Sequence, residues 1–333
     1  MNPDAFVADL ERKPAVLSRL ATSLAAGNPW ADVVPPGIER VVLIGMGSSA
    51  YAGGVAAARM RARGLVAVSD LASSSLLPRW GAGALVVATS ATGGSVETLD
   101  ALERMQAANP SATFVALTNT PGSALAQRCG AVVDLAADPE EGGVACRTYQ
   151  HTVAMLIALE EQLSGGDTSA LAGAVAASAT ASAHLLDTED SWRPRVADLL
   201  LGPAGTHLAA PAHRFSSAQQ GALMLRECPR LPAVGCETGD WSHVDVYLTK
   251  TTDYRLLVFA GSPWEQQLAE WTTMRKTTVV AVGGDVPSAQ FTVRYPGDTD
   301  DDAGDLVRLL TEVLIPELVA ARAWQESARN RTA

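Results

Sequence analysis

The sequence is poor in the residues that build metal centres, disulfides and nucleic-acid surfaces. Only four of its 333 residues are cysteine and five are histidine. Neither set has metal-site spacing, and an even number of cysteines in a long chain that looks cytosolic indicates free thiols. Lys and Arg number 25 against 36 Asp and Glu, a formal net charge of −11. This balance argues against nucleic acid and anionic membranes as partners, because phosphate backbones select basic surfaces.

Long apolar runs are also scarce. We find none that approaches the ~20 residues needed to cross a bilayer, and the first residues, Met-Asn-Pro-Asp-Ala, lack the pattern of a signal peptide. We therefore expect a cytoplasmic protein without a membrane partner. The hydrophobic share of 47% is ordinary for a globular chain, and the length suffices for two domains with cores of their own.

Strand patterns alternate with helical patterns along the first half of the chain. An amphipathic helix pair is predicted over residues 3–27, and an alanine-rich helix over about 168–186. Between them the predicted strands are 40–45, 66–69, 84–89, 112–118 and 131–134, followed by a long helix at about 150–163. Alternation at this spacing is typical of a mostly parallel sheet with helices on both faces.

The second half repeats the first weakly. Its strand-like pieces lie at 206–209, 255–260 and 277–281. They match, in the same order, the strand at 41–45, the strand and turn at 85–92 and the strand at 113–117 of the first half. This order predicts an internal duplication. Gly261-Ser262-Pro263 follows the middle piece, so the copy lacks a hydroxyl-rich turn and phosphate binding is expected in the first half. The acidic run Asp298–Asp302 is interpreted as a solvated loop.

One segment of the first half combines glycines with hydroxyl side chains directly after a strand. It contains Ser90, Thr92 and Ser95 and leads into a helical pattern that begins at Val96. The first N–H groups of a helix lack partners and lie at the positive end of its dipole, so this turn is suited to a phosphate. Alternatively, Ser95 merely caps the helix. This segment alone favours neither interpretation.

A second turn, Gly47-Ser48-Ser49, follows the strand at 40–45 and has the same arrangement. Its glycines lack the spacing of a dinucleotide fingerprint, and no phosphate-loop lysine follows. In an open parallel sheet both turns would lie at the carboxyl edge, where such sheets bind ligands.

The two turns together resemble the sugar isomerase (SIS) domain, in particular the tandem isomerase half of the glucosamine-6-phosphate synthases. Ser90–Thr98 matches that family's Ser-Gln-Ser-Gly-Glu-Thr-x-Asp-Thr, and Gly47-Ser48-Ser49 its Gly-Thr-Ser. The resemblance implies an α/β fold of two tandem SIS domains, each a mostly parallel five-stranded sheet in a flavodoxin-like three-layer arrangement. The expected parts are a helical segment (1–29), the first SIS domain with the phosphosugar anchor (30–165), a helical linker (166–190) and the second SIS domain (191–333).

A glutamate in the second half is the candidate base. Gln220–Glu227 is predicted to be helical and Pro229 to end the helix, so the Glu227 carboxylate faces the negative dipole end, which either raises its pKa or leaves it simply solvated. The resemblance decides: the family's Glu-Gly-Ala-Leu-Lys-Leu-Lys-Glu helix ends on the carboxylate that moves a proton between C1 and C2. Sixteen residues later, His243 takes the place of a histidine that opens the sugar ring from a neighbouring subunit. A homodimer is therefore expected.

A third matching segment is Glu141–Cys146, similar to a family loop that closes over the sugar with backbone groups; an ordinary connection is the alternative. The resemblance implies a phosphorylated sugar or amino sugar as ligand and no metal or organic cofactor. The implied catalytic residues are Glu227 and His243, and the implied binding residues are Ser48, Ser49, Ser90, Thr92, Ser95, Val144 and Ala145.

The departures from the family set the expected reaction. Ala91 replaces a glutamine, Met224 replaces a lysine, and residues 324–333 hold no counterpart of the family's C-terminal lysine. Without a glutaminase domain as well, glutamine-dependent amidotransfer is not expected. We expect proton transfer between C1 and C2 through an enediol or enolamine, as in an isomerase or deaminase. A non-catalytic phosphosugar sensor and a deglycase of phosphorylated sugar–amine conjugates remain alternatives.

Overall fold

The computed structural model describes residues 1–332, and the chain folds into two compact units. The first-sheet unit comprises Ser18–Pro139 and Ala145–Gly173. The second-sheet unit comprises Met1–Leu17, Glu140–Val144 and the chain from Ala174 onward. Ala333, the last residue of the predicted second domain, lies outside the described residues.

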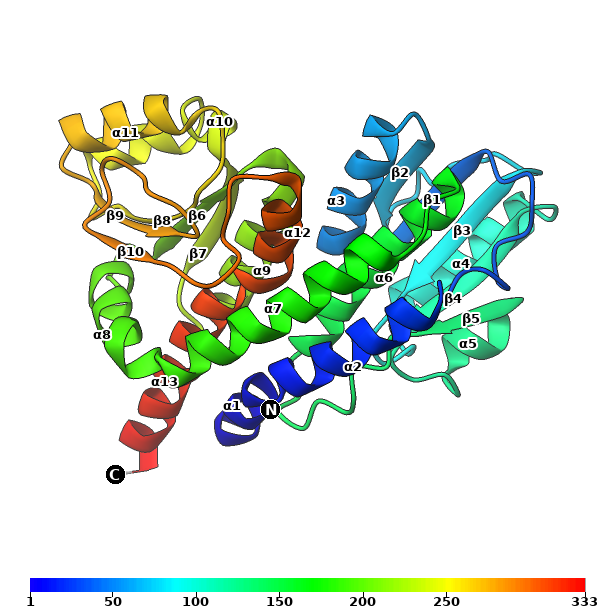
Figure 1. Ribbon diagram of the computed structural model, residues 1–333, viewed down its shortest axis with the longest axis horizontal. Helices are drawn as coiled ribbons and strands as arrows, with labels where there is room; N and C mark the ends of the chain where they lie inside the picture. The colour runs from blue at the N-terminus through cyan, green and yellow to red at the C-terminus, as the bar shows by residue number, and fades with distance from the viewer. Residues whose placement is uncertain (333) are drawn as a thin grey trace. The chain divides into compact units, whose positions relative to one another are not determined.

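The first sheet has five parallel strands in the order β2-β1-β3-β4-β5. The strands are β1 (Arg40–Gly45), β2 (Val66–Leu71), β3 (Ala84–Thr89), β4 (Thr113–Thr118) and β5 (Ala131–Asp134). The helices are α2 (Lys13–Ala26), which begins in the other unit, α3 (Ser48–Ala62), α4 (Val96–Ala108), α5 (Ala124–Arg128) and α6 (Arg147–Ser164). Figure 1 shows α3 and α6 on one side of this sheet and α4 and α5 on the other.

Burial on both faces explains why these strands are continuous apolar runs. In β1, Val42 and Ile44 belong to the core that packs against α4 and α5, while Val41 and Leu43 are buried on the opposite face. Helices on both sides of a parallel sheet require apolar residues at every strand position, and all six residues of β3 are buried.

The second sheet has the order β10-β9-β8-β6-β7, again with only parallel pairs among the described residues. The strands are β6 (Thr206–Ala210), β7 (Ala233–Glu237), β8 (Arg255–Phe259), β9 (Thr278–Val282) and β10 (Phe291–Val293). The helices are α1 (Pro3–Glu11), α7 (Ser169–Asp187), which begins in the first-sheet unit, α8 (Glu189–Leu200), α9 (Phe215–Glu227), α10 (Thr238–Trp241), α11 (Glu265–Met274), α12 (Asp302–Thr311) and α13 (Leu314–Thr332), with 3₁₀ turns at Ala212–Arg214 and Asp245–Lys250.

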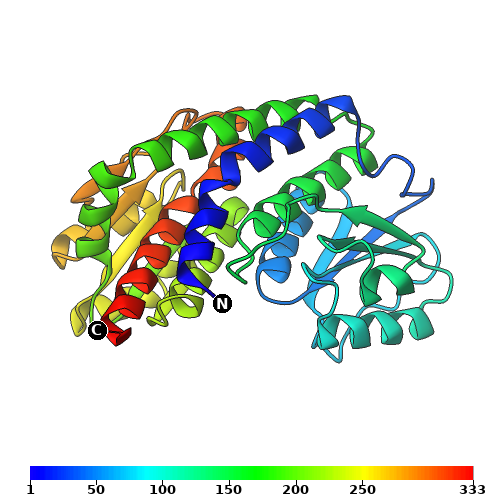
Figure 2. The ribbon, with the colours of Figure 1, turned by 90° about the horizontal axis from the view of Figure 1, so that it is seen from below.

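The N-terminal helix is part of the second-sheet unit. In Figures 1 and 2, α1 lies beside α13. The Gln325 side chain donates to the Asp4 carboxylate at 2.7 Å, and the Phe6 ring packs against Trp324. The helix thereby covers part of the surface of α13.

The predicted fold class is confirmed. Both sheets are parallel, five-stranded and flanked by helices, and both have the same strand order, which is consistent with tandem SIS domains. The predicted strands correspond to β1–β6, β8 and β9. Strands β7 and β10 were not predicted. All four cysteines are free thiols, as expected.

Helix α7 corrects the expectation that no apolar segment is long enough to cross a membrane. Among the described helices, it alone is long and apolar enough to cross a membrane, and half of its most apolar 18-residue stretch is buried. Val175 and Leu185 have no exposed surface, and Ser178 accepts a hydrogen bond from Thr311 at 2.8 Å. These contacts are typical of a core helix.

The acidic run Asp298–Asp302 is exposed from Thr299 onward, as expected of a solvated loop, and differs from that interpretation at Asp298. Asp298 is buried and binds the Arg294 guanidinium at 2.6 Å. Asp301 caps α12 by accepting the Gly304 N–H at 2.7 Å. The loop is therefore solvated over most of its length and anchored by bonds at Asp298 and Asp301.

Candidate active site

The two hydroxyl-bearing turns of the first-sheet unit follow strands that pair directly. Ile44 of β1 lies opposite Ala88 of β3, so both strands end at the same edge of the sheet. Between them, a Cβ at Gly45 would lie 2.7 Å from the Ser49 Cβ and 3.2 Å from the Thr89 carbonyl oxygen. Glycine at this position is what allows the Ser48-Ser49 turn to lie close to the end of β3.

The turn after β3 offers several donors. Among residues 1–332, the backbone N–H groups of Ala91 and Thr92 have no acceptor, and the Ser90 hydroxyl has no hydrogen-bond partner. Ser90 is largely buried and Thr92 is exposed, with its hydroxyl accepting the Gly94 N–H at 3.3 Å. Unpaired donors before a helix are suited to an anion.

Gly93 fixes the shape of this turn. Its φ is +61°, and a Cβ there would lie 1.9 Å from the Ser123 hydroxyl oxygen. Its N–H donates to the Ser90 carbonyl, and its carbonyl accepts the N–H of Leu125, which lies in the first turn of α5. The conformation needs glycine twice, for its dihedral angle and for space.

Ser95 is the N-cap of α4. Its Oγ accepts the Thr98 N–H at 3.3 Å and donates to the Glu97 carboxylate at 3.0 Å. Hydrogen bonds from the Glu97 backbone and from Ser95 lower the pKa of Glu97. Ser95 therefore has the capping role that was one of the two interpretations of the sequence. In the part of the chain that the structure describes, the donors without acceptors are the Ser90 hydroxyl and the N–H groups of Ala91 and Thr92.

The loop that carries Val144 is held against α1 within the second-sheet unit. The Gly142 N–H donates to Asp9 at 2.7 Å, and its carbonyl accepts from Asn2 at 3.1 Å. A Cβ at Gly142 would lie 2.6 Å from the Phe6 Cα, so glycine permits this close packing. Val144 is buried and Ala145 is partly exposed. Arg147, considered as a further anion contact, is buried and donates to the Ala137 carbonyl at 2.9 Å.

Glu227 is the last residue of α9, where the sequence predicted the helix to end. Its side chain is partly exposed, and burial raises the pKa of Glu227, with a further rise from the negative charge of Glu140. Helix α9 packs closely on β7, because Gly235 lies where a Cβ would be 2.7 Å from the Ala218 backbone. The carboxylate therefore projects from a firmly placed helix and is a stronger base than an ordinary glutamate.

His243 follows α10 and is exposed, with its N–H bonded to the Asp240 carbonyl at 2.8 Å. Its flanking residues are anchored: Trp241 donates to the Tyr254 hydroxyl at 2.9 Å, and Tyr254 donates to Asp245 at 3.1 Å. Among the described residues, no hydrogen bond or ion pair joins Glu227 to His243. The structure thus presents His243 to solvent on a segment that is fixed on both sides.

Other acids near His243 are already engaged. Glu237 is the N-cap of α10, and its carboxylate accepts the N–H groups of Gly239 at 2.8 Å and Asp240 at 2.9 Å. The Glu237 carboxylate is thus already engaged in capping α10. No group of three or more His, Cys, Asp or Glu side chains suited to a metal ion occurs within residues 1–332.

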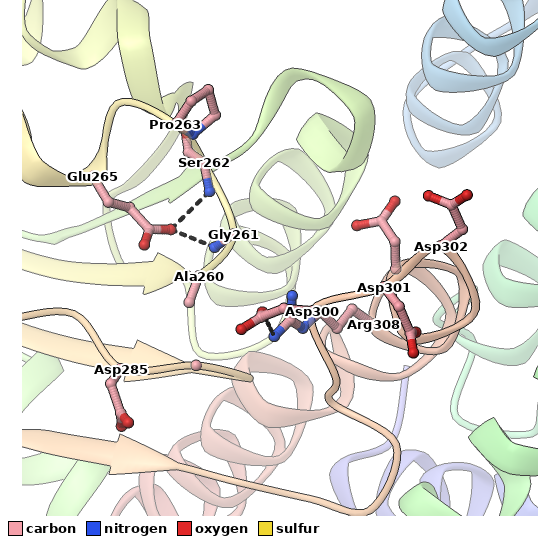
Figure 3. Close-up of a pocket in the computed structure, with 12 residues that line it drawn as sticks. Ala260, Gly261, Ser262, Pro263, Glu265, Asp285, Asp300, Asp301, Asp302 and Arg308 are labelled. Atoms are coloured by element: carbon pink, nitrogen blue, oxygen red, sulfur yellow. Dashed lines mark hydrogen bonds and ion pairs between the residues drawn. The ribbon is translucent and has the colours of Figure 1, made fainter.

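Sequence reasoning missed a cavity of about 550 Å³ in the second-sheet unit. It lies at the ends of β8 and β9, and the residues that line it include Gly261, Ser262, Glu265 and Arg308 (Figure 3). In the sequence, only the correspondence between Gly261-Ser262-Pro263 and the turn after β3 indicated that this part of the second sheet could hold a site.

Comparison with known proteins identifies relatives of this three-layer α/β chain. Residues 37–161 match the family model described as the SIS domain. Glutamine–fructose-6-phosphate aminotransferase (isomerizing) of Aeropyrum pernix is 24% identical over 82% of this chain and 44% of its own length. The chain spans less than half the length of the curated relatives it matches.

Solved structures share the fold over nearly the whole chain. The C-terminal domain of glucosamine-fructose-6-phosphate aminotransferase from Francisella tularensis has a TM-score of 0.75 at 13% identity, covering 96% of each chain. Glucosamine-6-phosphate deaminase from Thermotoga maritima has a TM-score of 0.72 at 16% identity, covering 97% of this chain and 95% of that one. Residues 37–161 thus match a SIS domain, and the chain is homologous to the isomerase part of glucosamine-fructose-6-phosphate aminotransferase.

Proposed function

We propose that the protein is an enzyme that isomerises or deaminates a phosphorylated sugar or amino sugar by moving a proton between C1 and C2. The observation that carries the proposal is the pair of adjacent turns at the ends of β1 and β3, with unpaired N–H groups at Ala91 and Thr92. Ser49, Ser90, Thr92 and Ser95 form the phosphate anchor, and Ser48 binds sugar hydroxyls. Val144 and Ala145 contribute backbone contacts to the sugar.

Glu227 is the base of the proposed reaction. In the isomerase form, its carboxylate takes the proton from C2 of an open-chain aldose, and the electron pair forms the enediol double bond as O1 gains a proton. Return of the proton to C1 and loss of the O2 proton give the ketose. A base is most effective when its pKa is near the working pH, and burial together with Glu140 raises the pKa of Glu227 in that direction.

His243 is the proposed ring-opening residue and acts in a neighbouring subunit of a homodimer. Its exposure fits this role, and it is flanked by exposed Val244, Tyr247 and Leu248. Grouped exposed apolar residues mark interaction surfaces. Mixed subunits provide the test: Glu227→Gln and His243→Ala proteins, each inactive, regain part of the activity when they exchange subunits.

Glutamine-dependent amidotransfer is not part of the proposal, because buried Met224 stands where the resemblance places a lysine of the helix. Together with Ala91, this replacement points to a substrate other than fructose 6-phosphate, and a non-catalytic phosphosugar sensor is the second candidate. A deglycase of sugar–amine conjugates would use the same base and anchor with a different leaving group.

Two measurements test the proposed function. A thermal-shift screen of sugar phosphates, amino-sugar phosphates and unphosphorylated sugars identifies the ligand class, and phosphorylated ligands alone are expected to raise the Tm. Exchange of the C2 proton in heavy water is then followed by NMR with each ligand that binds. Exchange supports the enzyme, whereas binding without exchange supports the sensor.

A further inference from the structure

The second sheet has its own equivalent of the turn that follows β3. Strand β8 is the central strand of its sheet, as β3 is of the first, and each is followed by a glycine-containing turn and a helix. The turn after β8 is Gly261-Ser262-Pro263, and helix α11 begins at Glu265. The two turns can therefore be compared donor by donor.

Their backbone donors differ in one respect. After β3, the N–H groups of Ala91 and Thr92 have no acceptor among the described residues. After β8, one carboxylate oxygen, Oε1 of Glu265, accepts the N–H groups of both Gly261 and Ser262, the latter at 2.8 Å. Figure 3 shows the Glu265 side chain turned back over this turn, with both bonds drawn. A side-chain anion thus lies where the first sheet offers donors to a ligand.

Two buried arginines surround the same turn. A Cβ at Gly261 would lie 2.6 Å from Nη2 of Arg214 and 3.2 Å from Nη1 of Arg308, and Gly261 has a φ of +117°. Arg308 is 3% exposed, and within residues 1–332 its Nε–H has no acceptor. Its guanidinium lines the cavity and reaches from α12 toward the turn (Figure 3). The Arg308 Nη2 already donates to the Gly283 and Asp298 carbonyls and to Asp300, so the Nε–H is the buried cationic donor left for an anion.

The acidic side chains of the cavity do not remove this preference. Asp305 is bound to Arg214 at 2.9 Å, Asp300 to Arg308 at 2.6 Å, and Asp301 caps α12. Asp285 lies 3.6 Å from the Arg294 guanidinium, and Asp302 remains to repel an incoming anion. A phosphate at this place would therefore bind more weakly than at the turn after β3.

We propose that the Glu265 carboxylate is a built-in occupant of a second anion position and restricts phosphosugar binding to the first sheet. The proposal rests on the proposed function in placing the ligand at the turn after β3. Glu265 is thus a specificity-determining residue: with it, the chain has one phosphate-ester site, and without it the turn after β8 becomes a second site for a phosphate monoester.

The test compares two substitutions of Glu265 and uses inorganic phosphate and glucose 6-phosphate as probes. In Glu265→Ala the occupant is lost, whereas the Glu265→Gln side chain keeps an oxygen that accepts both N–H groups. Binding stoichiometry is measured by calorimetry in the parent, and again in a Ser90→Ala/Thr92→Ala background that weakens the first site. We expect one site in the parent and in Glu265→Gln, and two in Glu265→Ala. In the double-variant background, only Glu265→Ala binds phosphate.

The outcomes separate this proposal from the proposed function. Two sites in the parent overturn the role of Glu265. The role is also overturned if Glu265→Ala gains no site although thermal unfolding shows it to be as well folded as Glu265→Gln. No site in the parent with a gain of one in Glu265→Ala overturns the anchor after β3 but supports the role of Glu265. If the alanine variant does not fold, Glu265→Ser, whose side chain is too short to reach the Gly261 N–H, is measured against the same criteria.

Discussion

Lys13 and Glu317 form an ion pair in which neither side chain has any exposed surface. They belong to α2 and α13, at opposite ends of the sequence, and both lie in the second-sheet unit. Burial raises the pKa of Glu317 to about 7, although the charge of Lys13 lowers it. Glu140 adds its charge to both Glu317 and Glu227, so this pair lies close to the proposed base.

The pair gives a stability prediction. Lys13→Met leaves the Glu317 carboxylate buried without a counter-charge, and removal of one partner of a buried pair costs about 3–5 kcal/mol of unfolding free energy. The double variant Lys13→Met/Glu317→Leu removes both charges and is expected to regain most of that loss. Urea unfolding of the three proteins measures this. Equal loss in the single and double variants would show that packing, not charge, is what the pair provides.

Gly93 and Gly94 form a matched pair for testing the turn after β3. Gly93→Ala forces a left-handed residue to carry a Cβ, at about 1–2 kcal/mol, and places that Cβ against Ser123. At Gly94 the nearest atom to a new Cβ is the Thr92 hydroxyl oxygen at 3.7 Å, so alanine fits. We expect Gly93→Ala to weaken phosphosugar binding at least about tenfold and Gly94→Ala to change it little. Equal affinity in both variants, by calorimetry, argues against the turn as the anchor.

The fold was predictable where apolar runs are long. β1 and β3 match their predicted bounds because burial on both faces leaves unbroken apolar segments, and the short edge strand β5 also matches its predicted bounds. β7 was missed because Gly235 interrupts it, and that glycine is what α9 needs in order to pack closely. β10 has three residues, too few for a pattern.

The candidate site was predictable in its local parts only. Glu227 ends its helix where Pro229 required, and the Ser95 cap was one of the two interpretations that the sequence left open. The back-folding of Glu265 onto its own turn was not, because a glutamate at a helix start is compatible with many rotamers. The Lys13–Glu317 pair joins residues 304 apart, which no local pattern specifies.

Loss of two anchor hydroxyls should weaken substrate binding without unfolding the protein. A hydrogen bond to a charged oxygen contributes about 1.5–3 kcal/mol, so Ser90→Ala/Thr92→Ala is expected to raise KM about 100-fold or more. Thr180→Ala, which removes an exposed hydroxyl of α7, is the control and should leave KM unchanged. If the double variant binds sugar phosphates as tightly as the parent, these hydroxyls serve the turn alone.

The pH dependence of the reaction should report the raised pKa of Glu227. The base must be ionised, so kcat/KM falls as the pH drops through that pKa, with a midpoint above 4.5, the ordinary value for glutamate. Glu140→Gln removes a negative charge that disfavours ionisation of Glu227, and the midpoint should therefore shift to lower pH. Glu141→Gln, at an exposed neighbour, should not shift it. If Glu140→Gln leaves the midpoint unchanged, the fall in kcat/KM at low pH reports the ionisation of a group other than Glu227.

The decisive variant is Glu227→Gln, which keeps the size of the side chain and the helix while removing the base. A general base contributes about 10²–10⁴ in rate, so exchange of the C2 proton with solvent should fall by at least a hundredfold. Ligand binding should be largely retained, because the phosphate anchor is built from the turns after β1 and β3. The matched control is Glu326→Gln on α13, which should leave exchange unchanged. Exchange that survives in Glu227→Gln would transfer the role to Glu237 or Asp240, although the Glu237 carboxylate already caps α10.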